Sequence, residues 1–510
     1  MTTLLPAPSR ALPERAGLRA WLALAVLFLP TLLVAIDNTV LGFALPAISR
    51  ALRPEATTLL WIVDAYPLVL AGLLITMGTL GDRIGRRRLL MIGVVGFGLV
   101  SAAAAFATDG AHLVAARAAL GFFGAMLMPA VLAILRGLFA DRTQRRLALA
   151  IWATAFAAGA ALGPVVGGLL LQHFWWGSVF LLNVPVMVLL LVAVPLLVPE
   201  SRMAAPGRLD LLGVALSLAA AVPGVLAIKL LGEHGVSLAS TGSAVVAVVA
   251  GVLFVRRCRS LVRAGREPLI DLRLFARPVL RLSVLANAST MFAFTGLLFF
   301  SAQYLQLVLG RSPMQAGLVL VPGMIATVVA GLGAARLARR FPVRVLVPVG
   351  LGLAAAGYVL CTQLGVGSAD TLLLVATVLI GAGIGLSETV TNDAILAAAP
   401  ADRAGAASAV SETAYELGAV LGTAILGSVL GGVYRATVDG AVAPAGSAPA
   451  ETLGGAVDTA AALPPESAVP LLTSAREAFT LGVDITAAVG AVTLILVALT
   501  VIRGLRPART

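Results

Sequence analysis

The stretch LVLAGLLITMGTLGDRIGRRRLL, residues 68–90, is an apolar run that ends in a cluster of arginines. Such a run suits a helix that crosses a lipid bilayer, and the arginines are typical of a loop that stays on the cytoplasmic side. A weaker copy of the pattern is LVLVPGMIATVVAGLGAARLARRFPVRVL, residues 318–346. The two copies indicate a membrane protein built by parallel duplication of one half.

Composition extends this interpretation to the whole chain. Hydrophobic residues make up 60% of the 510 residues and charged residues only 12%, with a mean hydropathy of +1.02, far above the values of soluble domains. The apolar runs have the length of helices and lack the alternation of an outer-membrane barrel, so we expect an all-α integral membrane protein. Fourteen candidate spans lie near residues 19–46, 57–80, 88–108, 111–135, 146–171, 178–198, 209–231, 239–255, 280–308, 315–338, 343–364, 370–398, 404–434 and 479–502.

The net charge of +12 would suit a nucleic-acid-binding protein, but its distribution does not. If the N-terminus is cytoplasmic, only five of the 36 Lys and Arg residues fall in loops on the outer side: Arg50, Arg53, Arg311, Arg435 and Arg476. This asymmetry follows the positive-inside rule and predicts a multi-pass protein with both termini in the cytoplasm and no nucleic-acid partner. Arginine outnumbers lysine 35 to 1, which indicates a GC-rich genome and favours a bacterial inner membrane.

The order of the apolar runs divides the chain into three parts. We expect an N-terminal six-helix bundle in residues 1–200 and a C-terminal six-helix bundle in residues 280–510. Between them, residues 201–279 would form two inserted transmembrane helices and a basic cytoplasmic linker. The segment 435–478 is rich in Ala, Gly, Pro and Ser, which predicts a long extracellular loop with a short helix near 467–479.

Parallel repeats are a pattern of secondary transporters, and few sources of energy for transport are compatible with this sequence. A nucleotide-driven pump needs a glycine-rich loop that ends in lysine, and the single lysine, Lys229, lies inside an apolar run. The cysteines, Cys258 and Cys361, and three histidines near span ends supply neither a disulfide framework nor the groups of a metal site or a catalytic centre. We therefore expect no cofactor, no metal and no enzyme activity, and coupling to an ion gradient remains.

Such coupling requires titratable groups inside the membrane, where charges are costly and tend to be functional. Asp37 lies in the middle of LLVAIDNTVLGFALPAI, residues 32–48. Glu412 and Glu416 are one turn apart on one helix face, so each carboxylate affects the protonation of the other. Hydrogen bonding to a neighbouring helix is the alternative role of this pair. Asp64 lies near the outer end of the second run, where a solvated acid is as ordinary as a functional one.

Two motifs resemble those of the major facilitator superfamily. GTLGDRIGRRR, residues 78–88, is similar to the signature loop that locks and releases the cytoplasmic side in that family. Arg117, in RAALGFFG, resembles the family's fourth-span arginine, which is implicated in proton transfer, and a buried arginine needs a partner in any case. The resemblance assigns the gating motif to Gly78, Gly81, Asp82, Arg83, Gly85, Arg86 and Arg87.

A third motif, GAALGPVVGG at residues 159–168, is similar to the fifth-span antiporter motif of that superfamily. Small residues let helices pack closely and proline permits a bend, so ordinary helix packing is the alternative explanation. In the family the motif is associated with exporters. Its residues here are Gly159, Gly163, Pro164, Gly167 and Gly168.

A narrower resemblance is to the fourteen-span drug:proton antiporters that export quaternary ammonium compounds. It rests on AIDNTVLGFALP (35–46), WIVDAYPLVLAG (61–72), FLLNVP (180–185) and SAVSETAYELG (408–418), which occur in the family's order. The resemblance implies that Asp37 and Glu412 are the main acids that respond to cations and protons, with Glu416 a second protonation site. Asp64 would be a supporting acid. The tenth run has no acid, whereas some relatives carry one there, which puts export of divalent cations in doubt.

We therefore expect a proton-coupled antiporter, acting as a monomer in membrane lipid, that exports lipophilic cations, dyes and drugs by alternating access. An exporter of an endogenous lipid or a self-made antibiotic is the alternative, and a non-transporting receptor or membrane enzyme is a third. Aromatic and methionine side chains would supply the substrate pocket. The candidates are Trp61, Tyr66, Met126, Phe156, Phe292, Tyr304 and Tyr415.

Overall fold

The computed structural model describes residues 16–139, 141–202, 209–266, 268–398, 404–444 and 447–505. Some side chains inside α5 and α14 also lie outside the described set, among them that of Phe156, a candidate for the substrate pocket. The described residues form helices, with no strand among them. The N-terminal helices are α1 (Leu18–Leu52), α2 (Ala56–Ile84), α3 (Arg86–Ala105), α4 (Gly110–Leu138), α5 (Arg142–His173), α6 (Ser178–Leu181) and α7 (Asn183–Leu197).

The remaining helices include two central ones, α8 (Leu211–His234) and α9 (Leu238–Arg263). After them come η1 (Leu272–Ala276), α10 (Pro278–Gln303), η2 (Tyr304–Val308), α11 (Pro313–Leu337), α12 (Val343–Cys361), α13 (Asp370–Ala398), α14 (Ala404–Thr437), α15 (Ala448–Glu451), α16 (Leu453–Ala461) and α17 (Pro465–Gly504).

Thirteen helices in the described residues are long and apolar enough to cross a membrane. With α5, which covers the fifth expected span, they agree with the fourteen spans predicted from the sequence. The all-α membrane fold is therefore confirmed. Mid-helix prolines such as Pro30 and Pro129 are tolerated because neighbouring helices can satisfy the freed backbone groups.

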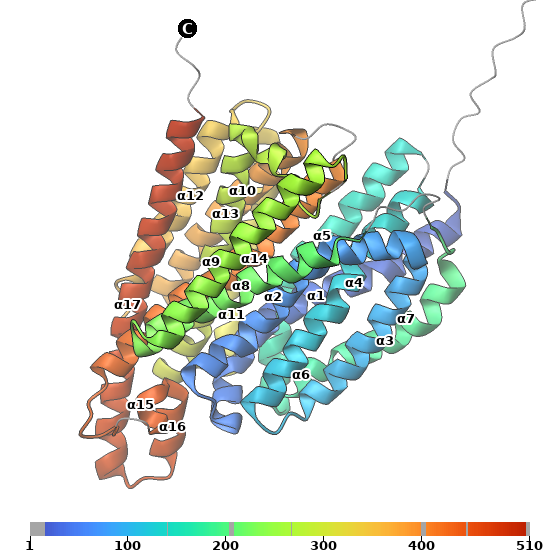
Figure 1. Cartoon of the computed structure of the whole chain (residues 1–510). Coiled ribbons are helices and arrows are strands. Elements are labelled where there is room, and N and C mark those ends of the chain that lie inside the picture. The colour runs from blue at the N-terminus through green and yellow to red at the C-terminus, as the bar shows by residue number, and fades with distance from the viewer. Residues whose placement is uncertain are drawn as a thin grey trace, which may run out of the picture.

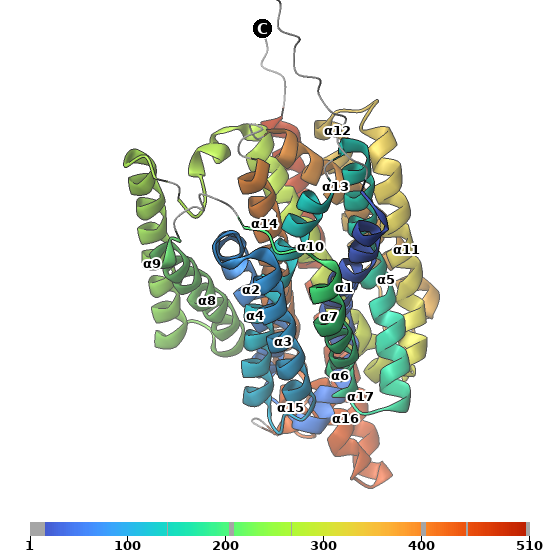
Figure 2. The same ribbon diagram turned by 90° about the vertical axis from the view of Figure 1, so that its right-hand side faces the viewer.

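Figure 1 shows α1–α7 as one group of helices beside a second group formed by α10–α14 and α17, with α8 and α9 lying across their junction. In Figure 2, α9 stands at the edge of the molecule, with α8 nearer the bundles. Helix α8 connects the two groups, because it packs on α2 of the first and on α14 of the second. The boundaries 1–200, 201–279 and 280–510 of the three expected parts stay a prediction.

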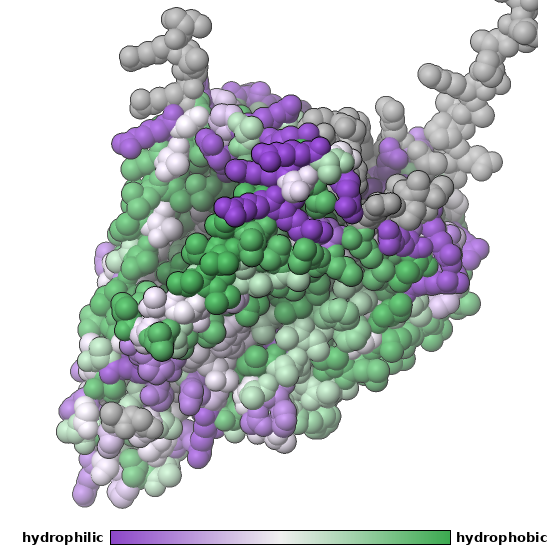
Figure 3. All heavy atoms as spheres, in the orientation of Figure 1, coloured by the Kyte–Doolittle hydropathy of each residue, from purple (hydrophilic) through white to green (hydrophobic). Residues whose placement is uncertain are grey.

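The two ends of the helical array differ in polarity. The start of α1 and the end of α17 lie at one end, which we call the terminal face, and α15 and α16 lie at the other, the α16 face (Figure 1). Hydrophobic residues cover the middle of the view in Figure 3, and hydrophilic residues gather at both ends. This belt is the surface expected of a chain surrounded by lipid.

The described residues of the segment 435–478 are mostly helical, unlike a long loop. Helix α14 extends to Thr437, α15 and α16 follow, and α17 already begins at Pro465. Proline suits the first turn of a helix because its missing N–H has no partner there. The segment packs on α1, since Arg53 lies 2.5 Å from Asp458.

Candidate functional site

A buried ion pair joins α1 and α4 in the first group of helices. The Arg117 guanidinium lies 2.6 Å from the Asp37 carboxylate, and both side chains are 2% exposed. Arg117 Nε donates to the Ile62 carbonyl at 3.1 Å, and the guanidinium lies 4.5 Å from the centre of the Tyr66 ring. Asn183 Nδ2 donates to Asp37 at 3.4 Å. Arg117 thus has the partner that a buried arginine requires, and the partner is the acid expected to respond to protons.

A central cavity of about 760 Å³ lies beside this pair, between α1, α2, α4, α10 and α14. Both Arg117 and Glu416 line it, so the cavity holds a guanidinium and a carboxylate from opposite groups of helices. Its aromatic and thioether surface comes from Met291, Phe294, Phe299 and Tyr415. Carboxylate and aromatic faces together suit a lipophilic cation, because both attract positive charge while the rings also bury apolar surface.

A cluster of acidic residues extends from the cavity along α14. Glu416 is 3% exposed and interacts electrostatically with Glu412, one turn closer to the terminal face. Glu412 in turn interacts with Glu388 of α13, a residue that the sequence did not single out for the site. The Tyr415 side chain interacts electrostatically with all three carboxylates. The predicted pair is therefore part of a group of three acids, of which Glu416 lines the cavity.

Asp64 is not the solvated acid that its place near the end of the second run allowed. Its side chain is fully buried, and Lys229 Nζ of α8 lies 2.8 Å from its carboxylate. The same ammonium lies 3.8 Å from the centre of the Trp61 ring. The sequence signal for this contact was the only lysine of the chain, placed inside an apolar run.

The expected gating motif forms the turn between α2 and α3 on the terminal face. Arg86 Nε donates to Asp82 at 3.0 Å, and Arg86 also donates to the Ala133 carbonyl of α4 at 3.2 Å. Gly85 has a φ of 113°, a conformation that favours glycine. The Glu200 carboxylate accepts from the backbone N–H groups of Arg87 and Arg88, where the helix dipole favours an anion.

The other members of this motif lie in α2, before the turn. Gly78 faces Pro129 of α4, and Gly81 faces Leu89 of α3. Arg83 is in the last turn of α2 and forms further interactions. The described contacts of this turn tie α2, α3, α4 and the end of α7 together, which leaves its gating role a prediction.

The glycines of the expected antiporter motif place α5 directly on two other helices. A Cβ atom at Gly159 would lie 2.4 Å from the Leu32 carbonyl oxygen of α1, and Gly163 and Gly167 repeat this contact along the same face. A Cβ atom at Gly168 would lie 2.8 Å from Pro313 at the start of α11. The Pro164 carbonyl lies against Gly317 of α11. The motif therefore joins the two groups of helices near the α16 face.

Only Tyr415 of the described pocket candidates lines the central cavity. Tyr66 lies beneath Arg117, and Met126 and Phe292 are packed in the bundle cores. Tyr304 donates to the Gly365 carbonyl at 2.7 Å, and Trp61 contacts Lys229. Met291 and Phe294 were missed, because helical spacing alone does not show which face of α10 meets the cavity.

Two helical bundles around a cavity with buried charges define a multi-pass membrane protein built for passage of a small molecule. The chain matches the model of the Major Facilitator Superfamily over residues 27–423 and belongs to this superfamily of transporters. It is 50% identical over 494 residues to the multidrug efflux pump LfrA of Mycolicibacterium smegmatis, with 96% of each chain covered.

A second relative is the methyl viologen resistance protein SmvA of Salmonella typhimurium, which is 37% identical over 472 residues, 90% of this chain and 93% of the relative. The resemblance to multidrug efflux transporters found in the sequence is thus confirmed. Among solved structures, a bacterial homolog of the human lysosomal transporter Spinster, inward-facing and unoccupied, has a TM-score of 0.62 at 17% identity over 97% of this chain and all of that chain. This likeness supports the fold.

Proposed function

We propose that the protein is a proton-coupled antiporter that exports lipophilic cations, including dyes and quaternary ammonium compounds. The observation that carries the proposal is the central cavity, in which Glu416 lies across from the Asp37–Arg117 pair among aromatic side chains. The names of the relatives LfrA and SmvA, a multidrug efflux pump and a methyl viologen resistance protein, support a cationic cargo.

Competition between proton and cation would couple the two fluxes. A lipophilic cation binds best when Glu416 is ionised, because the carboxylate then supplies the opposite charge. A proton on Glu416 removes that charge and releases the cation. Asp37 would respond through Arg117, which pairs with Asp37 and lines the same cavity as Glu416. One site that accepts either proton or drug, but not both, moves them in opposite directions.

The direction of export depends on the orientation in the membrane. We assign the terminal face to the cytoplasm of a bacterial inner membrane, because the arginines of the turn at 83–88 and of α9 and the linker at 256–281 belong to that face. The α16 face is then extracellular. We propose that the protein works as a monomer in membrane lipid.

Everted membrane vesicles with an imposed pH gradient test the proposal. Wild-type protein should accumulate ethidium only while the gradient lasts, and Asp37→Asn and Glu416→Gln should abolish accumulation. Glu466→Gln, an exposed acid near the start of α17, is the matched control and should transport normally. Ethidium flux that ignores the gradient would refute proton coupling, and the absence of any cation flux would leave a lipid or antibiotic as the better cargo.

A further inference from the structure

The inserted helix α8 meets the bundles along a narrow stripe. Leu218 packs against Gly72 of α2, and Gly232 packs against Ser428 of α14. Thr57 of α2 donates a hydrogen bond to Glu233. Most of the rest of α8 is half-buried, whereas most of α9, which stands at the edge of the molecule in Figure 2, is exposed. Lys229 lies within the stripe and is 1% exposed.

The Lys229–Asp64 pair is an unexpected way to dock a helix. Two charges removed from water recover little net stability, and apolar residues of similar size often hold elements together as well or better. Val225, one turn before Lys229 on the same stripe, holds α8 by apolar contact instead, because it packs with Leu68 and Val420. The ion pair therefore indicates a role beyond attachment of α8.

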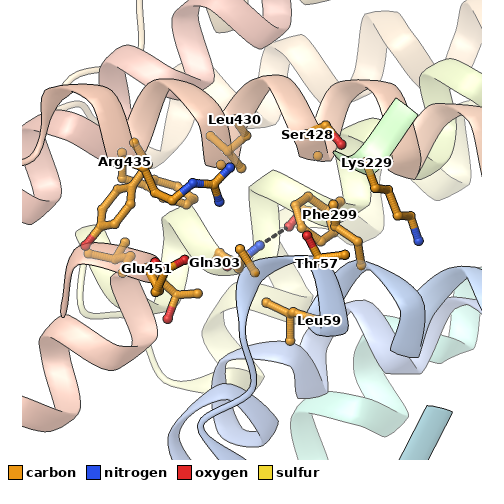
Figure 4. A pocket seen from close by; sticks show the side chains of 17 residues that line it. Thr57, Leu59, Lys229, Phe299, Gln303, Ser428, Leu430, Arg435 and Glu451 are labelled. Carbon is orange, nitrogen blue, oxygen red and sulfur yellow. Dashed lines mark hydrogen bonds between the residues drawn. The ribbon is translucent and has the colours of Figure 1, made fainter. Parts of the chain in front are cut away.

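The pair lies beside two spaces. Lys229 lines a pocket of about 500 Å³ near the α16 face, and Figure 4 shows it at the end opposite Arg435 and Glu451. Phe299 lines both this pocket and the central cavity. On the cavity side, Thr423 lines the central cavity and is a neighbour of Asp64. The two spaces thus share Phe299, and the ion pair lies beside both of them, because Lys229 lines the first and Asp64 neighbours the lining of the second.

We propose that Lys229 is a positioning residue of the transport site: with Asp64 and Trp61 it forms a lock, the α8 lock, that closes the route between the α16-face pocket and the central cavity. The inference rests on the proposed function for the orientation of the α16 face. The carboxylate and the Trp61 ring hold the ammonium from two sides, which fixes α2 against α8. Opening of the cavity toward the α16 face then requires release of this contact, so the inserted helices take part in the cycle.

Thiol accessibility tests the lock without substrate or gradient. The reporter is Thr295→Cys, which lines the central cavity, in a background with Cys258→Ser and Cys361→Ala. Intact cells are treated for increasing times with a membrane-impermeant cationic methanethiosulfonate. The thiol that remains unreacted is then quantified, which gives the rate of modification. Glu466→Cys, exposed near the α16 face, must react and so verifies the orientation. If it does not react, the proposed orientation is overturned, and the lock with it.

The test variant is the neutral pair Asp64→Asn with Lys229→Met, which leaves no unpaired buried charge. The lock predicts that modification of the reporter becomes at least about tenfold faster, a change of about 1.4 kcal/mol. The reversed pair, Asp64→Lys with Lys229→Asp, should restore protection. Neutralising a surface ion pair that lines neither space, Arg311→Met with Asp370→Asn, should leave the rate unchanged. An unchanged rate in the neutral pair would overturn the proposal and make Lys229 a packing residue.

Discussion

Arg117 of α4 lies 2.6 Å from Asp37 of α1 and also lines the cavity that Glu416 of α14 reaches from the other bundle. One guanidinium thus connects an acid in the core of the first bundle to the space where a substrate would bind. Protonation at either acid changes the charge that the other one senses through Arg117.

Replacing Arg117 alone should destabilise the protein more than replacing both members of the Asp37–Arg117 pair. Arg117→Met leaves the Asp37 charge buried without its partner, and we expect a loss of about 3–5 kcal/mol in the free energy of unfolding. The double variant Asp37→Asn with Arg117→Met should recover most of this loss but remain inactive in ethidium transport. Thermal unfolding in detergent, together with vesicle transport, measures both. Recovered transport in the double variant would argue against a role for the pair in coupling.

Close packing of α5 on α1 predicts a sharp difference between two glycines. Gly159→Ala should lower the free energy of unfolding by about 1–3 kcal/mol, because its Cβ atom would overlap the Leu32 carbonyl oxygen. Gly137→Ala, where no atom lies within 4 Å of the added Cβ, is the matched control and should be neutral or slightly stabilising. Equal melting temperatures for the two variants would contradict this packing.

The turn between α2 and α3 should depend on Gly85. Alanine there would combine a φ of 113° with a Cβ atom 2.6 Å from the Glu200 carboxylate, so we expect a loss of about 1–3 kcal/mol in stability. Gly333→Ala, in open space on α11, is the control. Melting temperatures in detergent measure the difference. A Gly85→Ala protein as stable as wild type would show that the turn adopts another conformation.

Binding of a lipophilic cation should release protons from Glu416. When tetraphenylphosphonium is added to purified wild-type protein in weak buffer, a pH indicator should report acidification. Glu416→Gln should release fewer protons, because one exchanging carboxylate is gone, whereas Glu466→Gln should match wild type. Equal release from wild type and Glu416→Gln would show that the exchanging proton lies elsewhere.

Local patterns predicted most of the fold, because the length and hydropathy of an apolar run are properties of consecutive residues. The contacts between helices were harder to predict. The sequence required a partner for Arg117 but could not distinguish Asp37 from other buried acids, since the pairing depends on how α1 and α4 pack.

Asp64 and the segment 435–478 show where local patterns mislead. The place of Asp64 near the outer end of its run allowed a solvated acid, yet its carboxylate is buried against the Lys229 ammonium, which the Trp61 ring also contacts. No spacing rule links residues 64 and 229, so only the packing of α8 on α2 brings them together. In 435–478 the small residues suggested a loop, but Pro465 begins a helix that runs on into the last span.

The most direct test of the account is exchange in proteoliposomes that hold purified protein and no other transporter. The vesicles are loaded with tetraphenylphosphonium and a trapped pH dye, then diluted into medium without the cation at equal pH, with the membrane potential clamped at zero by potassium and valinomycin. Antiport predicts that outflow of the cation drives protons inward and acidifies the interior in wild type but not in Asp37→Asn. Cation outflow from wild type with no change of internal pH would contradict proton-coupled antiport.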